Sequence, residues 1–372
     1  MRNHRADVDI SYSVQLAATA CVYNLTNRET GSTIPANMLS EVVKETLATM
    51  ERFQDRQQLQ KNCLMTLCSD KILKEVTFDY FKTAQLVMQC LCTNEDSAMH
   101  RMSVAIISIL AAKISTEQTA ILGCSKYMKV LLRIVEKKLN AAHLDLTLKF
   151  TLSALWNLTD ESPSTCQNFI DNDGLSLFVQ ILSVNDDNPC LQTKVLGLLN
   201  NLAEVPSLRC HLLEHDIQLI ESIQKLLHSK HIEVSYFAAG IISHLAILGA
   251  EDWIALTNVE KLRGELLTDL YNCVLSWKPP DGEMVAYRTF KPFFPLLRRH
   301  DTPAMQLWAA WAIRHVCLKN GEKYQEMLVA EEGIQCLGEV LTNPDLDKKV
   351  KELIKLTLES IEKTHPDIME CV

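Results

Sequence analysis

The sequence predicts an all-α protein built from repeated helical units. The chain has 372 residues, of which 47% are hydrophobic and 22% are charged, so it can bury a large core. Glycine and proline number only 11 each, which disfavours a sheet-rich fold with many tight turns. A short pattern also recurs at steps of roughly 42 to 48 residues, the spacing typical of two- and three-helix repeats. Together these observations predict an armadillo- or HEAT-like right-handed α-solenoid of about seven to eight repeats.

The recurring pattern is a tripeptide that ends in a hydrophobic residue, close to the end of the last helix of each repeat. Between the tripeptides, polar breaks are followed by amphipathic helices, for example at residues 168–184, 211–229 and 326–343. One longer step is explained by a small insertion at residues 137–145, and a step of roughly 71 residues requires a large insertion. We call the tripeptides the ladder; they are Tyr23-Asn24-Leu25, Met65-Thr66-Leu67, Ser108-Ile109-Leu110, Trp156-Asn157-Leu158, Asn200-Asn201-Leu202, Ser243-His244-Leu245 and Arg314-His315-Val316.

The whole chain, residues 1–372, is expected to form one armadillo-like repeat domain. The large insertion covers about 256–300, and Pro279, Pro280, Gly282, Pro292 and Pro295 rule out one continuous helix. Its aromatic segment 287–294 (YRTFKPFF) either packs against the neighbouring repeat, which we favour, or binds a partner. The charged segment of about 344–372 is expected to be a C-terminal cap.

Charge and cysteine content limit the partners and the compartment. The net charge of −9 makes nucleic-acid binding improbable and favours basic or ammonium-bearing partners. None of the 13 cysteines forms a C-x-x-C pair, so we expect no metal and no cofactor. There is no signal-like N-terminus and no apolar run of about 18 residues, so we expect no membrane and a location in the cytoplasm or also the nucleus.

The ladder contains one place where recognition chemistry gathers. Residues 153–160 (SALWNLTD) place Trp156 and Asp160 four apart, which on a helix is one face, with Asn157 beside them. The same positions of the next repeat, in residues 197–204 (GLLNNLAE), hold Asn201 and Glu204. An aromatic ring, two amides and two carboxylates are expected to meet between neighbouring helices, as a binding pocket with no catalytic residues.

Each of these residues also has a structural interpretation. The asparagines occupy positions where armadillo repeats bind an extended peptide backbone, and Glu204 could be a solvated helix end. His244 and His315 are interpreted as groove or core histidines, not metal ligands. The remaining tryptophans of the last repeats, Trp308 and Trp311, are expected to pack those repeats together.

The stretches SALWNLTDESPSTCQNFID, GLLNNLAEV and LWAAWAIRHVCLKN closely resemble the Zyg-11/Zer-1 family, the substrate receptors of cullin-2 RING ubiquitin ligases. The resemblance covers essentially the whole chain and corresponds to the family's C-terminal armadillo-like region. It implies recognition of proteins with an N-terminal glycine, a glycine N-degron, through Trp156, Asn157, Asp160, Asn201 and Glu204. The family binds cullin-2, elongin B and elongin C through an upstream region whose pattern is not in this chain, so we expect no ubiquitination by this chain alone.

The main alternative is a general peptide-binding armadillo adaptor, importin- or catenin-like, that binds basic extended segments. Such adaptors repeat their Trp and Asn pair in several repeats, whereas here the Trp position carries other residues in the remaining ladder tripeptides. An enzyme is the weakest hypothesis, because the sequence has no H-E-x-x-H, G-x-S-x-G or phosphate-binding glycine loop.

Overall fold

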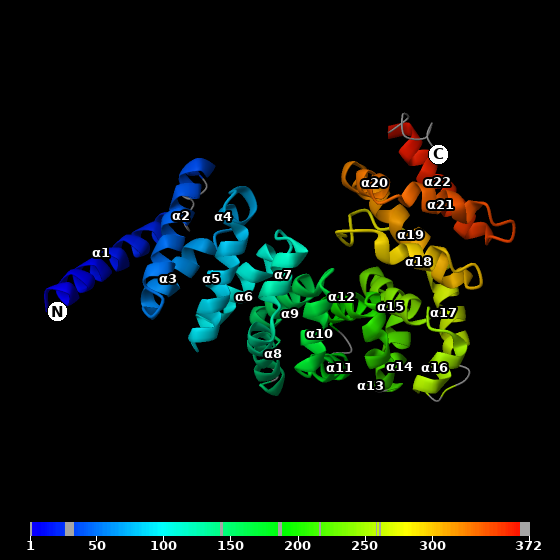
Figure 1. Ribbon diagram of the computed structural model, residues 1–372, viewed down its shortest axis with the longest axis horizontal. Coiled ribbons are helices and arrows are strands. Elements are labelled where there is room, and N and C mark those ends of the chain that lie inside the picture. The colour runs from blue at the N-terminus through cyan, green and yellow to red at the C-terminus, as the bar shows by residue number, and fades with distance from the viewer. Residues whose placement is uncertain are drawn as a thin grey trace. The chain divides into compact units, whose positions relative to one another are not determined.

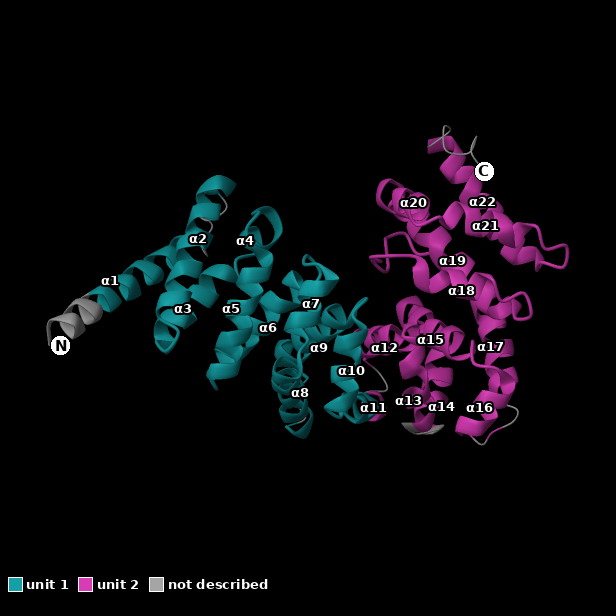
Figure 2. Cartoon of the chain, in the orientation of Figure 1, with its two compact units in different colours: residues 1–181 teal, residues 182–372 magenta. Residues whose placement is uncertain are grey.

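The structure is a computed structural model that describes residues 2–26, 33–141, 144–184, 188–215, 217–257, 259 and 262–364. Every regular element in these ranges is a helix, which confirms the all-α, armadillo-like class predicted from the repeat (Figure 1). The chain divides into two compact units, residues 1–181 and residues 182–372, which we describe separately (Figure 2).

The first unit stacks one helix of each repeat on the equivalent helix of the next repeat. Helix α1 packs on α3, α3 on α6, and α6 on α9. These ladder helices carry the first four ladder tripeptides in their last turns, as the sequence predicts. The helices of this unit are α1 (Arg2–Thr26), α2 (Ala36–Arg52), α3 (Gln57–Leu67), α4 (Asp70–Glu75), α5 (Tyr80–Thr93), α6 (Ser97–Leu110), α7 (Thr116–Leu122), α8 (Ser125–Asn140), α9 (Leu146–Thr159), α10 (Pro163–Asp171) and α11 (Gly174–Val184), which runs past its boundary.

The second unit repeats this arrangement with a different set of helices. Its ladder helices are α12, α15, α19 and α22; α12 packs on α15, α15 on α19, and α19 on α22. The remaining three ladder tripeptides lie near the ends of α12, α15 and α19. The helices are α12 (Pro189–Glu204), α13 (Arg209–His215), α14 (Ile217–Leu227), α15 (Ile232–Leu245), α16 (Ala250–Thr257), α17 (Leu262–Ser276), α18 (Phe294–Leu297), α19 (Pro303–Lys319), α20 (Gly321–Ala330), α21 (Gly333–Leu341) and α22 (Lys348–Thr364), with 3₁₀ turns η2 (Pro206–Leu208) and η3 (Lys291–Phe293).

Short polar side chains set where many helices begin. The carboxylates of Asp79, Asp96 and Asp145 accept hydrogen bonds from backbone N–H groups in the first turns of α5, α6 and α9. Ser115 and Gln118 form a reciprocal capping box at the start of α7. These caps satisfy N–H groups that have no partner inside the helix, so the sequence fixes the helix starts locally.

Side-chain donors connect successive ladder helices at their backbones. The Asn62 amide on α3 donates to the carbonyl of Leu16 on α1, at 3.4 Å. In the second unit the indole N–H of Trp308 on α19 donates to the carbonyl of Tyr236 on α15, at 3.3 Å. A carbonyl oxygen has two lone pairs, so it can accept such a bond in addition to its bond within the helix.

The large insertion is an ordered part of the second unit. It supplies α17, an extended segment, η3 and α18, although residues 258, 260 and 261 of it lie outside the described ranges. In the aromatic segment, Phe290 and Phe293 are fully buried, and the Phe293 ring stacks on Trp308 with centroids 5.2 Å apart. The favoured prediction, that this segment packs against its repeat, is therefore confirmed.

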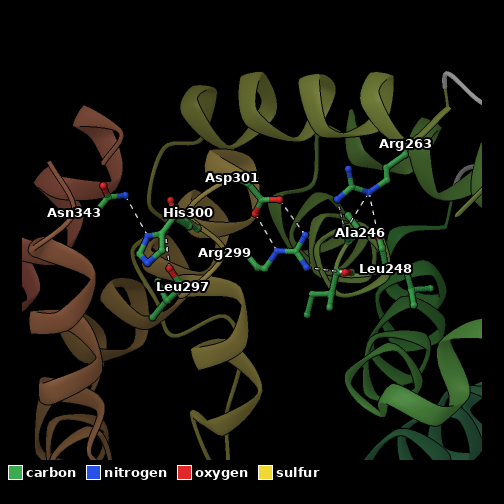
Figure 3. Close-up of polar contacts among 10 residues, drawn as sticks. Ala246, Leu248, Arg263, Leu297, Arg299, His300, Asp301 and Asn343 are labelled. Carbon is green, nitrogen blue, oxygen red and sulfur yellow. Dashed lines mark hydrogen bonds and ion pairs between the residues drawn. The ribbon is translucent and has the colours of Figure 1, made fainter. Parts of the chain in front are cut away.

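Two arginines of the second unit bind the carbonyl groups that follow α15 (Figure 3). Arg263 donates to the carbonyls of Ala246 and Leu248, with its shortest bond at 2.6 Å. Arg299 donates to the carbonyl of Ile247 at 2.9 Å and forms a two-bond ion pair with Asp301. The last carbonyls of a helix have no intrahelical partner and carry partial negative charge, so both guanidinium groups stabilise this end of α15.

Within the described ranges, no single helix is both long and apolar enough to cross a membrane. One pair passes that test together by length and composition, namely α15 and α16, but it is bent by 106°.

Gly240 marks the closest approach of three ladder helices, which leads to a stability prediction. A Cβ atom at Gly240 of α15 would lie 2.3 Å from Asn200 Oδ1 and 2.7 Å from a ring carbon of Trp308. We expect Gly240→Ala to lower the free energy of unfolding by about 1–3 kcal/mol, because a buried indole and an amide must move. In α17, Gly264 has no atom near its Cβ position, so Gly264→Ala should be neutral or stabilising by up to about 1 kcal/mol. Urea unfolding of both variants tests the prediction, and equal midpoints would contradict it.

Candidate functional site

The first half of the predicted pocket lies at the end of α9. Trp156 and Asn157 are half-buried, while the side chains of Leu155 and Leu158 on either side are fully buried. The two leucines therefore pack α9 against the core, and the side chains of Trp156 and Asn157 are more exposed to solvent than they are. This is the arrangement that the ladder predicts for α9.

Asn157 already uses one of its polar groups inside the protein. Its amide Nδ2 donates to the carbonyl of Ser108 on α6, at 2.8 Å. This bond belongs to the same class as those of Asn62 and Trp308, so the residue contributes to helix stacking. The Oδ1 atom is then the part of the side chain that would accept a hydrogen bond from a ligand.

Asp160 is the residue that caps the C-terminal end of α9. The helix ends at Thr159, and Asp160 keeps a helical φ of −60° but has an extended ψ of 117°. Glu161 follows in the left-handed region at φ 54°, and Pro163 then starts α10. Because φ sets the direction of the Cβ atom relative to the preceding turn, the four-residue spacing from Trp156 still applies to the half-buried Asp160, and the meeting of the two side chains stays a prediction.

The second half of the predicted pocket lies at the end of α12. Asn201 is buried, with 7% of its surface exposed, and the side chain of Glu204 is only 14% exposed. Asn200 donates from Nδ2 to Glu204 Oε1 at 2.7 Å. Arg209 binds the backbone next to it, donating to the carbonyls of Ala203 and Glu204. The Glu204 carboxylate is thus mostly buried and is fixed by its hydrogen bond with Asn200. The interpretation of Glu204 as a solvated helix end is wrong.

His244 lies next to this acid and is completely buried. Its Nε2 atom is 3.8 Å from Glu204 Oε1. Burial and, to a smaller extent, the positive charge of Arg209 lower the pKa of His244 to about 3, so the imidazole is neutral at physiological pH. A neutral imidazole contacts Glu204 without neutralising its charge.

His315, the other ladder histidine, belongs to an aromatic cluster in the second unit. It is buried and stacks on Trp311, with ring centroids 5.1 Å apart and an angle of 9° between the planes. Burial lowers the pKa of His315 as well, assisted by Lys319 and opposed by Glu283. Trp308 and Trp311 are buried in the same cluster, as the sequence predicts.

The two halves of the predicted pocket belong to different compact units. Trp156, Asn157 and Asp160 lie in residues 1–181, whereas Asn201 and Glu204 lie in residues 182–372. Each half is therefore described within its own unit, and the role of the five residues and their convergence into one pocket remain predictions.

Asn200 and His244 support Glu204, a role that the sequence pattern did not assign to them. Asn200 is four residues before Glu204 on one helix, a spacing at which side chains meet, so this pair was visible in the sequence. The contact with His244 joins two repeats and has no local signal. His244 is a ladder residue, and Glu204 lies two residues after the ladder tripeptide of the preceding repeat. This shared place in successive repeats is the sequence feature that could have suggested the contact.

One group of potential metal ligands lies elsewhere in the described residues. The ligand atoms of Cys210, His211 and Glu214 on α13 lie within 4.8 Å of one another. Glu214 is exposed, and exposed acids commonly gather without a metal. The expectation that the chain binds no metal stays a prediction.

The low pKa of His244 predicts a loss of stability in acid. Below pH 6.5 the unfolded chain takes up a proton on His244 that the folded state refuses until about pH 3. Stability therefore falls as the pH drops through this window, by about 2 kcal/mol between pH 7 and pH 5 from this group alone. Urea unfolding at both pH values should show a smaller loss in His244→Gln than in the parent. His231→Gln, at an exposed histidine, is the control, and an equal loss in all three proteins would contradict the prediction.

Comparison with known proteins assigns the family. The family model described as "Protein zer-1 homolog-like, C-terminal domain" matches residues 1–363. The human "Protein zer-1 homolog" is 31% identical over 350 residues, covering 93% of this chain and 45% of that protein. "Zyg eleven-related protein 1" of Caenorhabditis elegans is 29% identical over 367 residues, covering 97% of this chain and 39% of that protein.

Two of the similar solved structures are an engineered protein and a designed protein, both with low sequence identity. A crystal structure titled as an engineered protein has a TM-score of 0.48 and 16% identity, covering 94% of this chain and 95% of that chain. A computationally designed armadillo repeat protein for modular peptide recognition has a TM-score of 0.42 and 16% identity, covering 74% of this chain and 98% of that chain. The chain spans less than half the length of the human and nematode relatives, and it belongs to the zer-1 homolog family, whose C-terminal domain it matches.

Proposed function

We propose that this chain is the substrate-recognition module of a cullin-2 ubiquitin ligase and binds the free N-terminal glycine of target proteins. The proposal rests on membership of the zer-1 homolog family and on the resemblance of residues 153–160 and 197–204 to the family's recognition motif. The observation that carries it in the structure is Glu204, a mostly buried carboxylate held at the end of a ladder helix.

A protein N-terminus is an ammonium group with three N–H donors and an ordinary pKa of about 7.7–8.0. Glu204 offers it a carboxylate whose closest histidine is neutral, and Asp160 offers a second one. The side-chain oxygens of Asn157 and Asn201 would complete the hydrogen bonds. Two nearby carboxylates favour the charged amine and should raise its pKa on binding.

Selection for glycine is a steric matter in this proposal. Trp156 is half-buried and lies between two fully buried leucines, which restrict its position. Its flat ring would contact the first Cα atom of the target and leave no space for a Cβ atom. Excluding one methyl group by fit alone is worth about 1–3 kcal/mol, so N-terminal serine or alanine should bind weakly.

The ligase partners are proposed to bind outside this chain. The human relative is more than twice as long as the matched region, and the resemblance assigns cullin-2, elongin B and elongin C to an upstream region. This chain would then supply recognition only, with no catalytic residue and no cofactor.

Calorimetric titration with a short peptide that begins with a free glycine tests amine recognition. The control is the same peptide with an acetylated N-terminus, which lacks the positive charge and adds bulk. We expect binding of the free peptide only, because acetylation removes the positive charge and leaves one N–H where the ammonium group offers three to Glu204 and Asp160. Equal binding of both peptides would mean that the chain binds internal backbone, as a general armadillo adaptor does.

Substitutions at the pocket residues test the proposed location. Glu204→Ala should weaken binding of the free-glycine peptide by about 3 kcal/mol, or more than 100-fold, because a mostly buried charge partner is removed. Asp160→Ala and Trp156→Ala should each cost about 1–3 kcal/mol, since these residues are less buried.

The matched controls are Asp171→Ala on α10 and Glu233→Ala on α15, two exposed acids in the respective units. They change the net charge by the same amount and should leave the dissociation constant within about twofold. Parent-like binding of the three pocket variants would place the site elsewhere on the chain.

A further inference from the structure

Next to Glu204 the second unit contains buried side-chain polar atoms that take no part in the hydrogen bonds of the helix backbones. They belong to Asn200 on α12 and to His244 on α15, and both side chains are almost completely enclosed. Buried polar atoms nearly always have hydrogen-bond partners, so exceptions in a native protein require an explanation.

Asn200 has one satisfied end and one unsatisfied end. A carboxylate can only accept hydrogen bonds, so the amide Nδ2 must face Glu204, which it does at 2.7 Å. This orientation turns Oδ1 toward the backbone of Gly240, where it has no hydrogen-bond partner among the described residues. The hydrogen bond from Asn200 Nδ2 to Glu204 therefore leaves the Asn200 Oδ1 atom as a buried acceptor without a partner among the described residues.

His244 is unsatisfied at both ring nitrogens within the part of the chain that the structure describes. Its distance of 3.8 Å from Glu204 Oε1 is too long for a hydrogen bond, and its ring packs edge-on against Trp308. A leucine or phenylalanine would fill such a space without unpaired atoms. The position instead holds a polar but uncharged ring against the carboxylate.

Gly240 provides the space that this arrangement needs. The Asn200 oxygen occupies the volume that a Cβ atom would take, and Trp308 closes the other side. The amide therefore has little freedom to rotate away from Glu204. Asn200, Gly240 and Trp308 together restrict the position of the Glu204 Oε1 atom.

We propose that Asn200 and His244 are positioning residues, which fix the Glu204 carboxylate in one orientation for a cationic ligand without adding a positive charge beside it. This inference rests on the proposed function of Glu204 in binding the N-terminal ammonium. A free glutamate side chain would lose conformational freedom when it binds, and Asn200 removes that loss in advance. His244 lies beside the acid without a positive charge of its own. Arg209 is the cation that interacts with the Glu204 charge, and it donates its N–H groups to the backbone carbonyls of Ala203 and Glu204.

A double-mutant cycle tests the role of Asn200. The four proteins are the parent, Asn200→Ala, Glu204→Gln and the double variant, each titrated calorimetrically with the peptide that begins with a free glycine. We expect Asn200→Ala to weaken binding about tenfold in the parent and less than about twofold in the Glu204→Gln background. Equal factors in both backgrounds would overturn the proposal, because Asn200 would then act independently of the carboxylate.

The stoichiometry of the same titrations separates positioning from folding. A variant that only destabilises the fold lowers the number of active sites, whereas a mispositioned acid raises the dissociation constant at full stoichiometry. Ser243→Ala is the matched control, since Ser243 is fully buried beside His244 and its hydroxyl bonds only within α15. It should bind as the parent does.

His244→Phe tests the polar ring against simple packing. Phenylalanine keeps an aromatic ring against Trp308 but removes both nitrogens, so we expect full stoichiometry with binding at least about threefold weaker. Parent-like affinity would overturn the role of His244. If the parent itself fails to bind the free-glycine peptide, the proposed function fails, and this result is distinct from a parent that binds while the cycle shows no coupling.

Discussion

The bonds between successive ladder helices are the interaction on which each unit depends. Asn62, Asn157 and Trp308 each reach from one ladder helix to a backbone carbonyl of the preceding one. Apolar packing alone allows helices to slide, because it has no direction, whereas a hydrogen bond fixes the register. The placement of Asn157 against α6, and of Trp308 against α15, follows from that register.

The sequence predicts the ladder helices well because each repeats the same period of buried residues. Leu155 and Leu158 are buried, and the tripeptides fall near the helix ends. The exact ends of the helices lie beyond this reasoning. The end of α9 is decided by the left-handed turn at Glu161 and by Pro163 further on, and hydrophobic period contains no information about such a turn.

The surroundings of Glu204 could be predicted only in part. Its bond to Asn200 follows from their spacing on one helix, but its proximity to His244 depends on the packing of two repeats. Burial then changes the chemistry of the histidine, which lowers its pKa and keeps it neutral. The protonation state of His244, and so the net charge beside Glu204, therefore depends on how α12 and α15 pack and not on the residue types alone.

The arginine contacts at the end of α15 have a consequence for how the insertion relates to the site. Arg263 lies on α17 and Arg299 follows α18, so both come from the inserted stretch, yet they hold the carbonyls directly after the helix that carries His244. The insertion thus supports the C-terminal end of α15, in addition to packing its own aromatic segment against Trp308. A change in the length of this stretch would therefore disturb the end of α15, although α15 itself lies outside the stretch.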